Sequence, residues 1–141
     1  AALFEGERID VVPAPALGGI IIGHEVARAL VVRSVFAERR DGAMTLRRGF
    51  EITDGERVLV VEDVVTTGGS VREVAELARS AGAEVVGFGF ILDRSGGAAG
   101  LDAPARALAS LPLVSYEPEK CPLCAEGLPV DSPGSRTDPA A

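Results

Sequence analysis

Two adjacent carboxylates stand beside a run of hydroxyls and glycines near the middle of this sequence. Glu62 and Asp63 follow four apolar residues, and two valines separate them from Thr-Thr-Gly-Gly-Ser at positions 66–70. Glycines let a backbone approach a ligand closely, and backbone N–H groups with hydroxyls donate hydrogen bonds to a phosphate. Carboxylates accept hydrogen bonds from a diol. The segment therefore predicts a site for a ligand shaped like a ribose 5-phosphate.

The neighbouring elements predict how these side chains are placed. Residues 58–61 read as a buried strand, and residues 62–69 are expected to form a turn. A helix is predicted over 70–81, with a Ser70-x-x-Glu73 capping box at its start and a glycine after its end. Ligands bind at the carboxyl edge of parallel sheets, and a helix N-terminus attracts anions. The strand thus delivers both carboxylates to the edge where the helix receives a phosphate.

Strands and helices alternate along much of the chain. Short apolar runs predict strands over 9–12, 31–37 and 85–92, and a helix is predicted over 20–30. Repeated strand–helix–strand units of this length indicate an α/β fold with a parallel sheet covered by helices. The charged segment 38–54 is expected to be a long loop or a loose hairpin. The second helix is expected to turn four charged residues to water: Arg72, Glu73, Glu76 and Arg79.

Composition and charge exclude several classes of protein. The 141 residues suit one domain, and 47% of them are hydrophobic, which allows a sizeable core. The net charge of −7 disfavours general nucleic-acid binding, because an acidic chain repels a phosphate backbone. No apolar run approaches the ~18 residues of a membrane span, and the chain shows no signal peptide. We therefore expect a cytoplasmic protein that binds neither nucleic acid nor membrane.

Other phosphate-binding motifs are missing from the sequence. It contains no Gly-x-x-x-x-Gly-Lys-Ser/Thr loop and no Gly-x-Gly-x-x-Gly that opens a helix. In a plainer interpretation, residues 66–70 are an ordinary turn in which Ser70 only caps the helix. That interpretation gives the acidic pair no role, so we favour a ligand site.

Residues 58–70 resemble the ribose-phosphate-binding signature of the type I phosphoribosyltransferases. The shared pattern is an apolar strand, two acidic residues, two apolar residues and a Thr/Gly-rich loop. The resemblance implies the family's parallel sheet with helices on both faces, and binding of 5-phosphoribosyl-1-pyrophosphate with Mg²⁺. It implies that Glu62 and Asp63 hold the ribose hydroxyls at the catalytic centre. The implied substrate-binding residues that follow, of which the last five wrap the 5′-phosphate, are Val64, Val65, Thr66, Thr67, Gly68, Gly69 and Ser70.

Within that family, the flanking segments are most similar to those of the orotate branch. Residues 15–19 resemble the loop that contacts the pyrophosphate, often through a non-proline cis peptide, which implies binding roles for Leu17, Gly18 and Gly19. Arg94 lies where the family has an arginine that pairs with the orotate carboxylate. An ordinary turn at 15–19 and a weak surface ion pair at Arg94 remain as alternatives.

Residues 38–49 lie where the family has its mobile catalytic loop. Family members usually carry lysines there, whereas this chain carries arginines, which can also clamp a pyrophosphate. We assign Arg39 and Arg40 to catalysis, and a solvated run of charge is the alternative. Family members are dimers whose mobile loop reaches the neighbouring site, so we expect a homodimer.

The ends of the chain depart from the family pattern. The family's N-terminal hood segment, which covers the base, has no counterpart before the first strand, so we expect it to be absent. We expect a catalytic core over 1–115 and an irregular tail over 116–141. Cys121 and Cys124 in that tail have the spacing of metal ligands. Three alternatives remain open for these cysteines: a reduced pair, a labile disulfide, or a zinc site shared across a dimer. Because tetrahedral zinc needs four ligands, we assign no metal site to a single chain.

The reaction that the resemblance implies is transfer of ribose 5-phosphate to orotate. Its products are orotidine 5′-monophosphate and pyrophosphate, in pyrimidine biosynthesis. The alternatives are a purine or uracil phosphoribosyltransferase and a regulator that senses the sugar donor. Arg94 favours an acidic base, and the acidic charge of the chain disfavours a regulator that binds nucleic acid. His24, the single histidine, is expected to be structural.

Overall fold

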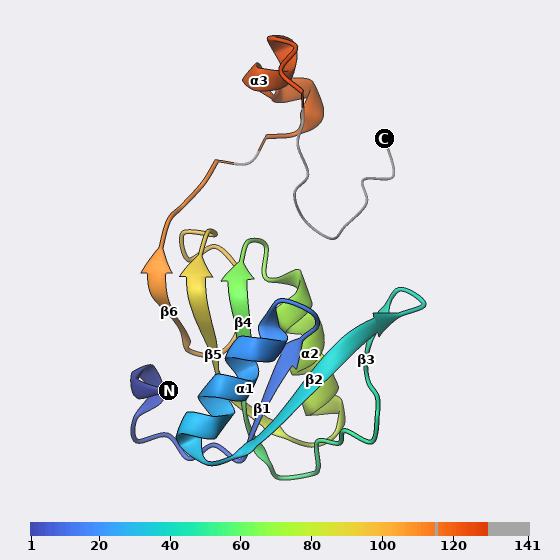
Figure 1. The fold of residues 1–141 in the computed structure, drawn as a ribbon, viewed down its shortest axis with the longest axis vertical. Coiled ribbons are helices and arrows are strands. Elements are labelled where there is room, and N and C mark those ends of the chain that lie inside the picture. Colours follow the sequence, from blue (N-terminus) through green and yellow to red (C-terminus); the bar gives the residue numbers. More distant parts are fainter. Residues whose placement is uncertain (115, 130–141) are drawn as a thin grey trace.

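The computed structural model describes residues 1–114 and 116–129 and is built on one sheet (Figure 1). The strand order is β3-β2-β1-β4-β5-β6. Neighbouring strands are parallel except for β2 and β3, which form an antiparallel hairpin. The predicted α/β fold with a mostly parallel sheet is confirmed. The strands are β1 (Val11–Pro15), β2 (Arg33–Arg40), β3 (Ala43–Leu46), β4 (Arg57–Val65), β5 (Glu84–Asp93) and β6 (Ala105–Ser110).

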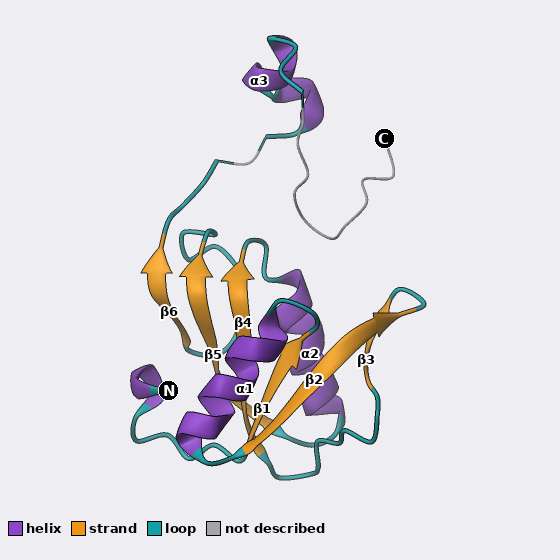
Figure 2. Ribbon diagram, viewed as in Figure 1, coloured by secondary structure: helices purple, strands orange, loops and turns teal. Residues whose placement is uncertain are grey.

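Two helices cover opposite faces of the sheet, as Figure 2 shows. They are α1 (Gly19–Leu30) and α2 (Gly69–Ser80). Because successive strand residues point to opposite faces, β4 contributes to two cores. Val58 and Val60 belong to the core beneath α2, whereas Leu59 and Val61 pack with Ala27 of α1. Burying each such side chain contributes about 1.5–3 kcal/mol, so β4 is the central support of the fold. The predicted helices on both faces are confirmed.

Helix α2 begins differently from the prediction. Its N-cap is Gly68, whose φ of 76° is left-handed, and no side chain caps the helix. Ser70 lies in the first turn, so the predicted capping box is wrong. Glu73 pairs with Arg39 of β2 instead of facing only water. The predicted glycine after the helix is confirmed, with Gly82 in a left-handed conformation at φ 83°.

Several strands are longer than the apolar runs that predict them. Strand β4 continues through Val65, so Glu62 and Asp63 lie within a strand. The turn predicted over 62–69 is therefore too long, because only residues 66–68 lie between β4 and α2. Strand β2 continues to Arg40 and pairs with β3, so the segment after Ala37 begins as a hairpin. Strand β6 is not predicted at all, because most of its residues are exposed at the sheet edge. Pairing with neighbours extends the strands beyond what hydrophobicity alone indicates.

Short elements flank this core. They are η1 (Ala2–Phe4), η2 (Pro118–Lys120) and α3 (Pro122–Ala125). Residue 115 and residues 130–141 lie outside the described residues, so the domain boundary and the irregular tail stay predictions. Among the described residues, no helix is both long and apolar enough to cross a membrane.

Candidate active site

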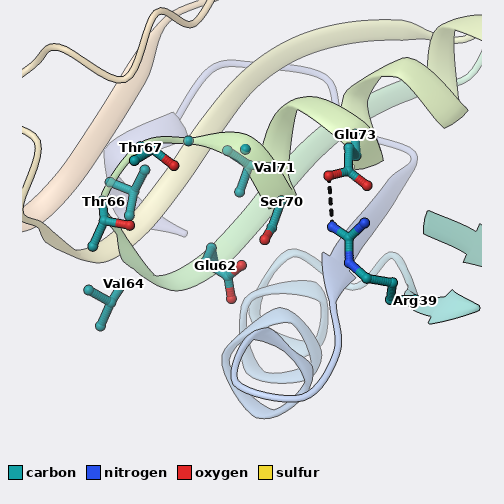
Figure 3. Close-up of a pocket in the computed structure, with 11 residues that line it drawn as sticks. Arg39, Glu62, Val64, Thr66, Thr67, Ser70, Val71 and Glu73 are labelled. Atoms are coloured by element: carbon teal, nitrogen blue, oxygen red, sulfur yellow. Dashed lines mark hydrogen bonds and ion pairs between the residues drawn. The ribbon is translucent and has the colours of Figure 1, made fainter. Parts of the chain in front are cut away.

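A pocket opens where β4 ends and α2 begins (Figure 3). We call the connecting residues 66–70 the cradle. A Cβ at Gly68 would lie 2.8 Å from the carbonyl oxygen of Ala99, so close packing and the positive φ both favour glycine there. The first turn of a helix leaves N–H groups without intrahelical partners, and its dipole favours an anion. The predicted binding residues that line this pocket are Val64, Val65, Thr66, Thr67, Gly68, Gly69 and Ser70.

The two strand carboxylates lie beside the cradle, and both are half-buried. Glu62 lines the cradle pocket. Asp63 accepts a hydrogen bond from the N–H of Val64 at 2.7 Å and lies against the turn between β1 and α1. A Cβ at Gly18 would be 2.5 Å from Oδ2 of Asp63, and one at Gly19 would be 2.9 Å from Oε1 of Glu62. The glycines therefore allow the turn to pack on both carboxylates.

The turn between β1 and α1 is open to a ligand. Leu17 is 74% exposed, and the peptide bond between Ala16 and Leu17 is cis, as the family resemblance implies. The N–H of Ala16 donates to the carbonyl oxygen of Ala37 at 2.8 Å, which ties the turn to β2. Ala16 and Leu17 line a second pocket together with Arg39. The sheet thus brings the predicted pyrophosphate loop to the same edge as the cradle.

The two predicted catalytic arginines have different surroundings. Arg39 lines both the cradle pocket and the pocket beside Leu17. Its guanidinium donates to Oε1 of Glu73 at 2.7 Å, as Figure 3 shows, and to the Gly42 carbonyl oxygen at 2.7 Å. The hydrogen bond and charge of Glu73 raise the pKa of Arg39 further above its usual range. Arg40 instead lies 3.5 Å from Asp41 on the exposed hairpin, so only Arg39 reaches the site.

Arg94 lies in an adjacent pocket that shares Thr66 and Thr67 with the cradle. Its Nε is buried and has no hydrogen-bond partner. Among the described residues Arg94 makes no ion pair, which disfavours the surface-pair alternative. An arginine in a polar pocket with an unpaired nitrogen is suited to bind a carboxylate. We call this the Arg94 pocket.

Asp93 holds the loop after β5, whose Ser95 and Ala98 line the Arg94 pocket. It accepts hydrogen bonds from the hydroxyl of Ser95 at 2.6 Å and from the N–H groups of Ser95 at 2.7 Å and Gly97 at 3.1 Å. The hydroxyl contact, reinforced by the two N–H groups, lowers the pKa of the Asp93 carboxyl against the opposing effect of burial. Sequence reasoning missed this role, although Asp-x-Ser followed by two glycines is a recognisable turn pattern.

The remaining candidate residues lie outside these pockets. His24 is exposed on α1, with Nδ1 3.3 Å from Oε1 of Glu25. Cys121 and Cys124 are both free. Within the part of the chain that the structure describes, no three or more His, Cys, Asp or Glu residues gather in a group able to hold a metal ion.

The fold and this edge of the sheet define a phosphoribosyltransferase. The family model for the phosphoribosyl transferase domain matches residues 2–116. Adenine phosphoribosyltransferase from Thermoanaerobacter pseudethanolicus shares the fold, with a TM-score of 0.68 and 21% identity over 77% of this chain and 74% of that one. Orotate phosphoribosyltransferase from Aeropyrum pernix matches with a TM-score of 0.61 and 27% identity, over 74% of this chain and 62% of that one.

Sequence relatives narrow the class. Orotate phosphoribosyltransferase of Caldanaerobacter subterraneus subsp. tengcongensis is 60% identical over 136 residues, which span 96% of this chain and 72% of that protein. Orotate phosphoribosyltransferase of Pelotomaculum thermopropionicum is also 60% identical, with the same coverage. The chain therefore belongs to the orotate phosphoribosyltransferase family.

Proposed function

We propose that this chain transfers the ribose 5-phosphate of phosphoribosyl pyrophosphate to orotate, releasing orotidine 5′-monophosphate and pyrophosphate in pyrimidine biosynthesis. The observation that carries the proposal is the sharing of Thr66 and Thr67 between the cradle and the Arg94 pocket. A phosphate site beside a site for an acidic base matches the two substrates of this reaction. Identity of 60% to proteins named for orotate supports the choice of base.

In the proposed reaction, an orotate nitrogen attacks C1 of the ribose and pyrophosphate leaves. Such a displacement passes through a transition state like an oxocarbenium ion, in which positive charge develops on the sugar. The carboxylates of Glu62 and Asp63 are suited to stabilise that charge while they hold the ribose hydroxyls. The cradle would bind the 5′-phosphate at the start of α2.

Negative charge develops on the leaving pyrophosphate. Leu17, Gly18 and Gly19 are the proposed contacts, because this turn packs on the two carboxylates and remains open to a ligand. Arg39 lies between the turn and the cradle and supplies a permanent positive charge there. We assign Arg40 a lesser part than the sequence suggests, because it lies on the exposed hairpin.

Mg²⁺ fits this site as an ion carried by the substrate. Magnesium is commonly held by one or two carboxylates together with substrate phosphates, and it keeps several waters. Glu62 and Asp63 offer two carboxylates, without a third acidic group that would complete a protein cage among the described residues. When bound, Mg²⁺ neutralises and orients the pyrophosphate.

A homodimer and a cytoplasmic location complete the proposal. The β2–β3 hairpin extends away from the rest of the sheet in Figure 1, which gives it the reach to approach a second copy. Arg39 and Arg40 lie near the end of that hairpin. Sedimentation of the chain at micromolar concentration would test the dimer.

Pyrophosphate release tests the proposed reaction directly. The chain would be mixed with phosphoribosyl pyrophosphate and Mg²⁺, and orotate, uracil, adenine, guanine and hypoxanthine would be offered separately. We expect release with orotate alone. Release with another base would assign a different acceptor. If no base causes pyrophosphate release, and the chain binds nucleic acid in a way that depends on phosphoribosyl pyrophosphate, the result would instead support a regulator.

A further inference from the structure

Arg72 joins two loops that come from different strands. It lies on α2 after the cradle, and its Nη1 donates to the Thr67 carbonyl oxygen at 2.8 Å. The same nitrogen donates to the carbonyl oxygen of Ala99, in the loop that follows β5. Thr67 belongs to the cradle, and Ala98 of the second loop lines the Arg94 pocket. One guanidinium therefore links the walls of both pockets.

The contact with Arg72 sets the direction of one peptide in the cradle. The carbonyl of Thr67 and the N–H of Gly68 belong to the same peptide unit. In a planar trans peptide these two groups point to opposite sides. Because the carbonyl faces Arg72, the Gly68 N–H must face away from it. Gly68 lines the cradle pocket, so this N–H is available to a bound phosphate.

The packing around Gly68 leaves little freedom at this junction. A Cβ at position 68 would lie 2.9 Å from Nη1 of Arg72 and 3.1 Å from the Cβ of Ala99. Arg72 makes no ion pair among the described residues, so no nearby carboxylate neutralises its charge. It therefore holds two carbonyl oxygens and also adds positive charge beside the cradle.

We infer that Arg72 is a positioning residue of the active site, which orients the Gly68 N–H toward the 5′-phosphate and ties the cradle to the wall of the Arg94 pocket. The inference rests on the proposed function, since it names the residue that prepares the donor site. Loss of Arg72 frees the Thr67 peptide to rotate and loosens both walls. Binding of both substrates should then weaken, while the reacting groups themselves remain.

The same helix offers a matched control. Arg79 lies two turns further along α2 and pairs with Oδ1 of Asp102 at 2.7 Å. Like Arg72, it connects α2 to the segment between β5 and β6. It lines none of the pockets of the site. R79M removes a comparable link without touching the cradle.

The test compares steady-state kinetics of the wild type with R72M, R72K and R79M. We expect R72M to raise KM for phosphoribosyl pyrophosphate about tenfold, the effect of losing about one charged hydrogen bond, and to raise KM for orotate as well. Its kcat at saturation should stay within about threefold of the wild type, because substrate binding is what this contact prepares. R72K keeps the charge but not the planar fork, so an intermediate KM is expected. R79M should match the wild type.

The possible outcomes separate this inference from the proposed function. An active wild type with unchanged KM values in R72M would overturn the positioning role of Arg72. Equal effects of R72M and R79M would reduce Arg72 to a structural contact and also overturn it. If R72M does not fold, R72K decides, because an unaltered KM for the sugar donor there contradicts the inference. A wild type that releases no pyrophosphate with any base contradicts the proposed function instead.

Discussion

Gly18 packs against Asp63 so closely that a Cβ at position 18 would lie 2.5 Å from the carboxylate oxygen Oδ2. The two residues meet at the same sheet edge, where Gly18 lies in the turn after β1 and Asp63 lies near the end of strand β4. Neither φ nor a turn type demands glycine at position 18, where the backbone is helical. The glycine is required because the backbone must approach the carboxylate.

G18A should therefore lower turnover about tenfold or more, because its Cβ displaces Asp63. The fold should persist, since the residue lies in a turn before α1. The double variant G18A/D63N separates a local clash from a general disturbance. If the alanine acts through Asp63, the double variant should be no slower than D63N alone. Additive losses in kcat would contradict the proposed link between the two positions.

D63N should lower turnover at least about tenfold with the fold intact, because it removes a negative charge from beside the developing cation. D41N is a matched control, since Asp41 is fully exposed on the hairpin and asparagine also tolerates its φ of 50°. Far-UV circular dichroism and kcat would be measured for both variants. Near-normal turnover of D63N would remove Asp63 from the mechanism.

R39M and R40M should differ although the residues are neighbours. We expect R39M to raise KM for phosphoribosyl pyrophosphate about tenfold or more, because Arg39 lines the cradle and the pocket beside Leu17. R40M should change it by no more than about twofold, since its exposed contact with Asp41 is worth little. Removing both together should weaken pyrophosphate handling about as much as R39M alone. Equal rises in KM in the two single variants would show that the hairpin contributes only its total positive charge, without a specific role for Arg39.

The hydrogen bonds to Asp93 predict a change in stability in acid. They lower its pKa in the folded state below that of the unfolded chain, so its contribution to stability is complete above about pH 4. That contribution is lost as the pH falls through the depressed folded pKa. The difference in Tm between the wild type and D93N should thus be constant near neutrality and shrink below about pH 4.

S95A supplies the control for this acid transition. It removes the hydroxyl that contributes most to lowering the Asp93 pKa, so the folded pKa moves closer to that of the unfolded chain. The loss of stability in acid should then be smaller than in the wild type and should end at a higher pH. Thermal melts from about pH 2.5 to 7 would detect the shift. If Tm falls with pH by the same amount in the wild type, D93N and S95A, Asp93 is not the group that causes the loss of stability in acid.

The central elements could be predicted because local patterns agree with the tertiary structure. The apolar run 58–61 and the stripe of α2 identify the strand and helix that hold the cradle. The start of α2 could not, because Ser70 and Glu73 fit a local capping pattern while Glu73 has a partner 34 residues away. Ion pairs over such distances in the chain leave no periodic signal. The sequence alone therefore locates the cradle but not the ion pair at its rim.

The edge strands and the loop contacts were beyond sequence reasoning for a related reason. Strand β6 has no fully buried residue, because it lies at the edge of the sheet and pairs only with β5. The role of Arg72 depends on Ala99, and that of Gly18 depends on Asp63, in each case a contact between residues far apart in the sequence. Charge and spacing within one segment give no sign of either.

The strand order explains where the crevice comes from. The chain leaves β1 toward β2 on one side of the sheet, whereas β4 leads to β5 and β6 on the other. The loops after β1 and β4 therefore part at this topological switch point, and a cleft forms from connectivity alone. Since the proposed site for the sugar phosphate is built on that divergence, the loops after β5 can diversify separately. One framework can thus serve enzymes named for adenine and for orotate, and exchange of those loops is a rational route to altered acceptors.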